Sequence, residues 1–376
     1  MMAVNLGTGT PEEARNWLEY CNNTAGTKYA DLRISHGYKD PFNVKLWCLG
    51  NEMDGPWQIG HVPAETYAIS AQQTARMMKM VDPKIELVVC GSCAINLPTY
   101  LEWDRKVLEH CKGDVEFISV HRYVENHEHD TENFLAVTNS IDEQIEAMDS
   151  VCASVHHTKK TKRKVKISFD EWNVWYRART PEQLDGRGKI APHLLEEVYN
   201  LEDALIAAGF LNSFIRHADS VKIANIAQIV NVIAPLLTRG DDLVYQTIFY
   251  PIEMMAKRRD GISLQIRVEG SEYKSKDYGV AKTLDSSAIL NGNELSVFLV
   301  NRDTSLPLEV TVDLADQAIN KLLNAEIISG SDPNTANTFE NPNAITSQNF
   351  DGFTIKAGKA VTTLPPLSFC AATFSL

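Results

Sequence analysis

The 376-residue sequence has no excess of basic side chains: 36 Lys and Arg stand against 49 Asp and Glu, a net charge of −13 at pH 7. Nucleic acids and anionic membranes bind basic faces, so this balance argues against both as partners. No apolar run approaches the roughly 18 residues of a membrane-spanning helix. The amino end also lacks the basic segment and apolar core of a secretion signal. We therefore expect a cytoplasmic protein that acts on small molecules.

Cysteine is present but not in a disulfide pattern. The seven cysteines are odd in number and irregularly spaced, which indicates a reducing setting. Cys90 and Cys93 form a Cys-x-x-Cys, but no second ligand pair at zinc spacing is visible. We predict the end of a strand followed by a loop of small residues. The sequence thus predicts neither a metal site nor a cofactor.

Short apolar runs that end in glycine or polar residues alternate with helical patterns. The first helix has a strong start, with Thr10 as N-cap, Pro11 at the first helical position and Glu13 completing a capping box. The strands are predicted at 2–6, 45–49, 85–92, 115–120, 165–169 and 220–226, and the helices at 10–21, 65–80, 98–112, 141–155 and 196–218.

Six strand–helix alternations indicate a parallel sheet with helices outside it. They are two short of an eight-stranded barrel, and the chain opens directly on a strand. We therefore predict a (β/α)₈ TIM barrel over residues 1–258, with its first two units upstream of Met1. An open doubly wound sheet is the alternative, which the absence of Gly-x-Gly-x-x-Gly after the first strand disfavours.

After about Gly261 the pattern changes to period-two alternation, which is typical of strands. Asn291-Gly292-Asn293 is a hairpin signal. We predict a C-terminal β-sandwich over residues 259–376, with a structural or accessory role. Its strands are expected at 262–268, 287–290, 295–300, 308–312, 354–355 and 368–374.

Two glutamates follow strands of the predicted barrel. Glu52 comes after the run Lys45–Leu49, and Glu171 after Val165–Phe169. Barrel active sites lie at the carboxyl ends of the strands. Three units apart in a barrel, the two carboxylates would face one cavity. Such a pair can cleave glycosides, one residue protonating the leaving oxygen and the other attacking the anomeric carbon or activating water.

The neighbours of these glutamates suit a sugar. Trp172, Trp175 and Tyr176 offer flat rings on which sugar faces stack, and Asn51 can hydrogen-bond a hydroxyl group. His121 and Tyr123 follow the intervening strand, where they can hydrogen-bond a nucleophilic carboxylate and keep it ionised. The competing interpretation is that the acids brace loops or cap helices. The combination favours a glycosidase.

The stretches 50–61 and 168–176 resemble the two signature motifs of the glycoside hydrolase family 51 α-L-arabinofuranosidases. Residues 1–9 resemble that family's third barrel strand, and residues 227–235 its eighth. The resemblance implies a retaining enzyme with Glu52 as general acid/base and Glu171 as nucleophile. It also implies substrate contacts from Asn51, His121, Tyr123, Trp175 and Gln228, an arabinofuranosyl oligosaccharide as substrate, a homo-oligomer (a hexamer in the family) and no metal.

Two geometric expectations follow. A retaining pair should have its carboxyl groups about 5 to 5.5 Å apart, against 6.5 to 9.5 Å for an inverting pair. Ionised Glu171 should also raise the pKa of Glu52. The sequence leaves open an inactive sugar-binding protein and a β-xylosidase or endoglucanase. A metal hydrolase using the acidic and histidine residues 125–130 also stays open, although their spacing fits no helical zinc motif.

Overall fold

The computed structural model describes residues 1–180, 188–190, 192 and 194–376. Within them the chain divides into two compact units. The first comprises residues 1–122, 144–172 and 219–225, and the second comprises residues 123–143, 173–218 and 226–376.

The first unit is built on a six-stranded sheet whose strand order, β1 to β6, follows the chain. The pairs β1–β2, β2–β3, β3–β4 and β5–β6 are parallel. Because helices connect the strands, the carboxyl ends meet at one edge of the sheet. The predicted strand–helix alternation is therefore confirmed. The elements are β1 (Met2–Val4), α1 (Pro11–Asn22), α2 (Lys28–Ser35), β2 (Leu46–Leu49), α3 (Ala64–Val81), β3 (Glu86–Val89), α4 (Glu102–Cys111), β4 (Phe117–Val124), α6 (Thr138–Lys159), β5 (Lys166–Val174) and β6 (Val221–Ala224).

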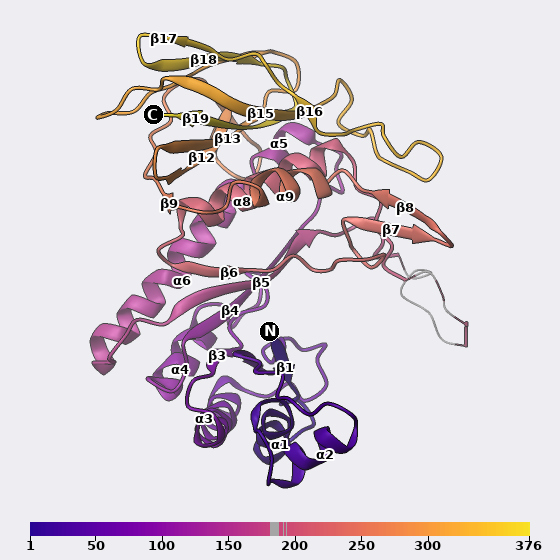
Figure 1. The fold of residues 1–376 in the computed structure, drawn as a ribbon, viewed down its shortest axis with the longest axis vertical. Helices are drawn as coiled ribbons and strands as arrows, with labels where there is room; N and C mark the ends of the chain where they lie inside the picture. The colour runs from indigo at the N-terminus through magenta and orange to yellow at the C-terminus, as the bar shows by residue number, and fades with distance from the viewer. Residues whose placement is uncertain (181–187, 191, 193) are drawn as a thin grey trace. The chain divides into compact units, whose positions relative to one another are not determined.

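Helix α1 begins as the sequence predicts. The backbone N–H of Glu13 donates to the Thr10 hydroxyl at 3.2 Å, and the Glu13 carboxylate accepts from the Thr10 N–H at 2.8 Å. Leu18 is fully buried on the inner face of this helix. Helix α3 packs between α1 and α4 (Figure 1).

A buried tyrosine joins the carboxyl ends of β2 and β3. The Tyr67 hydroxyl donates to the Leu49 carbonyl at 2.7 Å and accepts from the Cys90 N–H at 2.7 Å. Its ring stacks on Trp103, whose indole N–H donates to the Cys90 carbonyl at 3.0 Å. Both strand ends, and the loops that follow them, are therefore fixed by α3 and α4.

The second unit combines helices with a two-layer β-sandwich (Figure 1). One sheet has the order β16-β15-β19-β13-β12-β9 and the other β14-β18-β17. The predicted hairpin is confirmed, with Asn291 paired to Glu294 across the turn. The elements are α5 (Thr131–Leu135), α8 (Leu201–Arg216), β7 (Leu236–Arg239), β8 (Asp242–Tyr245), α9 (Phe249–Ala256), β9 (Ile262–Ser263), β10 (Glu272–Lys274), β11 (Val280–Lys282), β12 (Leu284–Asn291), β13 (Glu294–Asn301), β14 (Leu308–Val312), β15 (Lys321–Ser329), β16 (Gln348–Asn349), β17 (Thr354–Lys356), β18 (Lys359–Leu364) and β19 (Ser368–Ser375).

Several predicted boundaries are wrong. Strands β4 and β5 continue to Val124 and Val174, so His121 and Glu171 lie within these strands and not after them. The helix expected from residue 196 begins at Leu201, because Asn200 and Asp203 form the capping box there. Glu197 lies before it, where its carboxylate accepts from the backbone N–H groups of Arg177 and Ala178. The strand expected at 262–268 is only β9. Beyond it, Leu264 and Ile266 pack on the sandwich core without forming a strand, which produces the alternation.

All seven cysteines carry free thiols, and Cys90 and Cys93 follow β3 as predicted. Among the described residues, no helix combines the length and the apolar character needed to cross a membrane.

Candidate active site

The loop after β2 places Glu52 through an unusual backbone. Gly50 has φ +99°, and a Cβ atom there would lie 3.1 Å from the Met53 side chain. Glu52 itself has φ +46°, in the left-handed region that costs a non-glycine residue about 1–3 kcal/mol. Buried Asp54 anchors the loop by accepting from the Cys93 N–H at 3.1 Å. Backbone strain of this kind is often found at functional sites.

The Glu52 carboxylate accepts three hydrogen bonds. One oxygen accepts from Nδ1 of His121 at 3.0 Å, and the other from the indole of Trp57 at 2.6 Å and the amide of Gln58 at 3.2 Å. Burial alone would raise the pKa of Glu52. The hydrogen bond and charge of His121, with the bonds from Trp57 and Gln58, outweigh burial and hold this pKa below its usual value. The predicted rise is therefore wrong, because a cationic ring lies beside the carboxylate.

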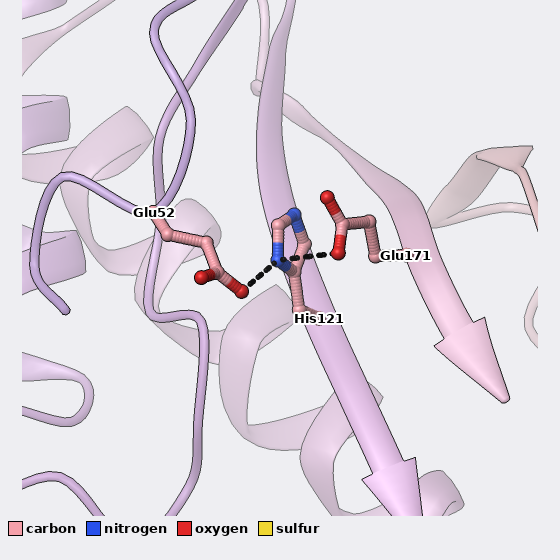
Figure 2. A group of neighbouring side chains, drawn as sticks. All are labelled: Glu52, His121 and Glu171. Carbon is pink, nitrogen blue, oxygen red and sulfur yellow. Dashed lines mark hydrogen bonds and ion pairs between the residues drawn. The ribbon is translucent and has the colours of Figure 1, made fainter. Parts of the chain in front are cut away.

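His121 lies between the two glutamates, as Figure 2 shows. Its Nδ1 is 3.0 Å from a Glu52 oxygen and 3.7 Å from a Glu171 oxygen, so its closer partner is Glu52, not the expected nucleophile. One oxygen of each glutamate and one ring nitrogen all lie within 4.8 Å of one another. Glu171 projects from β5 and is 30% exposed.

Asp170 and Ser119 hold the other side of the His121 ring. The Nε2 atom lies 3.2 Å from an Asp170 oxygen and 3.1 Å from the Ser119 hydroxyl, which donates to the same oxygen at 2.6 Å. Burial of the ring lowers its pKa. The hydrogen bonds to Asp170 and Glu52, with the charge of Glu171, outweigh it and raise the pKa of His121 to about 10. At neutral pH the ring is therefore an imidazolium.

A cavity of ≈ 240 Å³ adjoins these groups. Its lining includes Asn51, Ser119, His121, Asp170 and Glu171. The structure thus brings together Asn51 and Glu52, which follow β2, with His121 and Glu171, which lie in the carboxyl-terminal halves of β4 and β5.

The other three predicted residues belong to the second unit. There, Tyr123 and Trp175 pack edge to face with ring centroids 5.2 Å apart, and the Arg179 guanidinium lies 3.8 Å from the Trp175 ring. Gln228 is exposed, and its backbone N–H donates to the Ile233 carbonyl at 3.0 Å.

Two groups of residues are candidates for metal binding. Among the described residues, Glu52, His121 and Glu171 are close enough to share an ion, and both ring nitrogens of His121 already face carboxylate oxygens, of Glu52 and of Asp170. Three residues of the segment 125–130 interact with partners elsewhere in the second unit. Glu128 pairs with Lys276, Asp130 caps α5 by accepting from the Asn133 N–H, and Asn126 is buried against Glu202.

Comparison with known proteins gives the family. Residues 5–145 match the model of the α-L-arabinofuranosidase 1 domain, and residues 170–368 match that of the α-L-arabinofuranosidase C-terminal domain. An intracellular exo-α-(1→5)-L-arabinofuranosidase from Streptomyces lividans is 40% identical over 98% of this chain and 56% of its own length. The chain belongs to the family 51 α-L-arabinofuranosidases.

Further relatives agree with this assignment. An exo-α-(1→6)-L-arabinofuranosidase from Bifidobacterium longum is 38% identical over 99% of this chain and 74% of its own length. A solved family 51 enzyme from the same species superposes with a TM-score of 0.93 at 32% identity, covering 100% of this chain and 75% of that one. An arabinose complex from Thermotoga maritima gives 0.84 at 30% identity, with coverage of 100% and 75%.

These structures confirm the predicted fold class, an α/β barrel of which this chain carries six strands, followed by a β-sandwich. The chain spans 56% and 63% of the length of two curated relatives that it matches.

Sequence reasoning missed Asp170, Ser119 and Trp57 as part of this site. Asp170 directly precedes Glu171, and no pattern distinguishes the roles of these two adjacent acids. Ser119 is two residues before His121, so the two side chains lie on one face of β4. That alternation was a usable signal. The bond from Trp57 to Glu52 depends on the conformation of the loop, which no pattern predicts.

Proposed function

We propose that this protein is a retaining exo-α-L-arabinofuranosidase that releases terminal non-reducing arabinofuranosyl residues from oligosaccharides or polysaccharides such as arabinan and arabinoxylan. The observation that carries the proposal is the Glu52–Glu171 pair, in which one carboxylate oxygen of each residue lies within 4.8 Å of the other beside a cavity. Membership of the family supports the substrate class.

The chemistry is a double displacement. Glu171 attacks the anomeric carbon and forms a glycosyl ester, while Glu52 transfers a proton to the departing oxygen. In the second half, Glu52 removes a proton from water, whose oxygen attacks the anomeric carbon and releases Glu171. Both glutamates end as they began, and no cofactor or metal takes part.

The other assignments extend this proposal. The family resemblance assigns Asn51, His121, Tyr123 and Gln228 as contacts of the sugar or the nucleophile, and Trp175 to the leaving-group side. We further propose a cytoplasmic homo-oligomer, a hexamer as the family resemblance implies, with a catalytic region at 1–258 and an accessory sandwich at 259–376. Relatives named intracellular support the location.

The deciding experiment compares two variants on two leaving groups. Glu171→Gln should abolish turnover of every arabinofuranoside, because no ester can form. Glu52→Ala should retain formation of that ester from aryl arabinofuranosides, whose leaving groups need little protonation, and lose activity on natural linkages. Glu125→Gln is the matched control, since this acid is 57% exposed and pairs only with nearby His127 among the contacts described.

Equal losses on aryl and natural glycosides in Glu52→Ala would contradict the acid role. Loss of turnover in Glu125→Gln would favour the metal-hydrolase alternative. Hydrolysis of α-(1→5)- and α-(1→6)-linked disaccharides, measured side by side with xylopyranosides and hexopyranosides, separates the linkages and tests the β-xylosidase and endoglucanase alternatives. A wild-type chain that binds arabino-oligosaccharides without turnover would be a sugar-binding protein.

A further inference from the structure

The Asp170 carboxylate is contacted by polar side chains from three strands, β2, β4 and β5. Its side chain is only 8% exposed. One oxygen accepts from the Ser119 hydroxyl and faces Nε2 of His121, and the other accepts from the Ser168 hydroxyl at 3.0 Å. The Cys48 thiol, on β2, lies 3.9 Å from that second oxygen. A carboxylate held from this many sides has one fixed orientation.

Ion pairs therefore connect Glu52, His121 and Asp170, and they link the loop after β2 to β4 and β5. Other charged groups also face the ring. Glu171 lies 3.7 Å from Nδ1. Burial raises the pKa of Asp54, and the charge of His121 opposes that rise. On the α6 side, the neutral amide of Gln144 donates to the His121 carbonyl at 3.2 Å. The ring is therefore an imidazolium among carboxylates, and Asp170 is the one that faces Nε2.

We propose that Asp170 is a positioning residue that keeps both nitrogens of His121 protonated and aims the Nδ1 proton at Glu52. The ring then stores, beside the general acid, the proton that the leaving oxygen needs. This inference depends on the proposed function for its kinetic consequence, but not for the state of the ring.

The stored proton resolves a difficulty in the first step. In the structure Glu52 is held ionised by its hydrogen bonds, yet it must donate a proton when the glycosidic bond breaks. As the glycosidic bond breaks, the Nδ1 proton of His121 passes to Glu52 and on to the departing oxygen, so Glu52 ends ionised again. The ring becomes neutral, and Nε2–H remains bonded to Asp170. The proton that water releases in the second half returns through Glu52 to Nδ1, so the cycle balances.

The direct test is the protonation state of the His121 ring, followed by ¹⁵N NMR between pH 5 and 11 and assigned with His121→Asn. In the wild-type chain we expect both ring nitrogens protonated at pH 8. Asp170→Asn preserves the shape and removes the charge, so the midpoint should fall by about 1–3 pH units. Asp170→Glu should recover much of that fall.

Ser168→Ala is the matched control. It removes one hydrogen bond to Asp170 but keeps the carboxylate, so the His121 midpoint should stay at the wild-type value. A neutral ring at pH 8 in the wild-type chain would overturn the proposal, even if Asp170→Asn fails to fold. Equal midpoints in Asp170→Asn and the wild type would overturn it as well.

Kinetics give a second readout that a merely structural role would not move. On an α-(1→5)-linked disaccharide, the basic limb of the kcat/KM profile should follow the loss of the proton stored on His121. Because Asp170→Asn lowers the pKa of that ring, the limb should move to lower pH in this variant. A uniform loss of rate with no movement of the limb would indicate a structural role only. Absence of turnover in the wild-type chain would refute the proposed function and leave the NMR result to decide this inference.

Discussion

Trp57 is a large, exposed side chain with a polar contact to the proposed acid. Although 57% exposed, it donates its indole N–H to Glu52 at 2.6 Å. Trp57→Phe keeps a ring and removes the donor, so the ionised form of Glu52 loses a stabilising bond and its pKa rises. We expect the carboxyl titration of Glu52, followed by ¹³C NMR, to move up by about half to one pH unit.

The matched control for Trp57 is Trp17→Phe, at a tryptophan that is 39% exposed and packs edge to face on Trp47 in the same unit. Its Glu52 titration should match the wild type. A Glu52 titration that stays in place or moves to lower pH in Trp57→Phe would show that the indole does not set the acidity of Glu52.

For individual residues, the sequence predicted which side chains form the site better than it predicted how those side chains interact. Strand-end positions and residue types located Asn51, Glu52, His121 and Glu171, because the pleat and the strand direction determine where such side chains go. The direction of the Glu52 pKa shift could not be found in this way. It depends on which carboxylate His121 approaches more closely, a difference of 3.0 against 3.7 Å.

At the scale of elements, Tyr67 connects helix α3 to the ends of two strands. It is 1% exposed, and its hydroxyl satisfies the Leu49 carbonyl and the Cys90 N–H at once. Tyr67→Phe leaves both backbone groups buried without that partner. We expect the free energy of unfolding, measured in urea, to fall by about 1–3 kcal/mol. Because the Cys90 N–H donates to this hydroxyl, hydrogen exchange of the Cys90 amide should also accelerate.

Tyr38→Phe serves as the control for that measurement. Tyr38 is 56% exposed, so loss of its hydroxyl should leave the urea midpoint unchanged. A stable Tyr67→Phe protein with unchanged Cys90 exchange would mean that α3 does not hold the strand ends.

Elements with a complete local signal were predictable and the others were not. Helix α1 carries its capping box and an apolar face. Helix α2 has neither: Thr27 makes no side-chain capping bond, and its buried positions are Ala30 and Arg33. Arg33 is fully buried because it donates to the carbonyls of Tyr20, Asn23, Thr24, Tyr38 and Lys39. A pattern of apolar residues cannot reveal a helix that is held by an arginine.

At the scale of the second unit, a buried ionic network joins helix α8 to the sandwich. Asp285 on β12 is 2% exposed and pairs with Arg216 of α8 at 2.5 Å and with Arg302 at 2.6 Å. Arg216 also pairs with Asp142 at 2.7 Å. The proposed boundary at 258/259 divides the chain between these partners, so the sandwich and α8 should unfold together although they lie on opposite sides of it.

Asp285→Asn tests this coupling in the full chain. The change leaves Arg216 and Arg302 close together without their shared counter-charge, and breaking a buried pair in this way costs about 3–5 kcal/mol. Hydrogen exchange should show the opening free energies of α8 and β12 falling by the same amount. Glu340→Gln, which breaks an exposed ion pair with Arg239, should change neither element. Destabilisation confined to β12 would instead show that the sandwich unfolds as an independent domain.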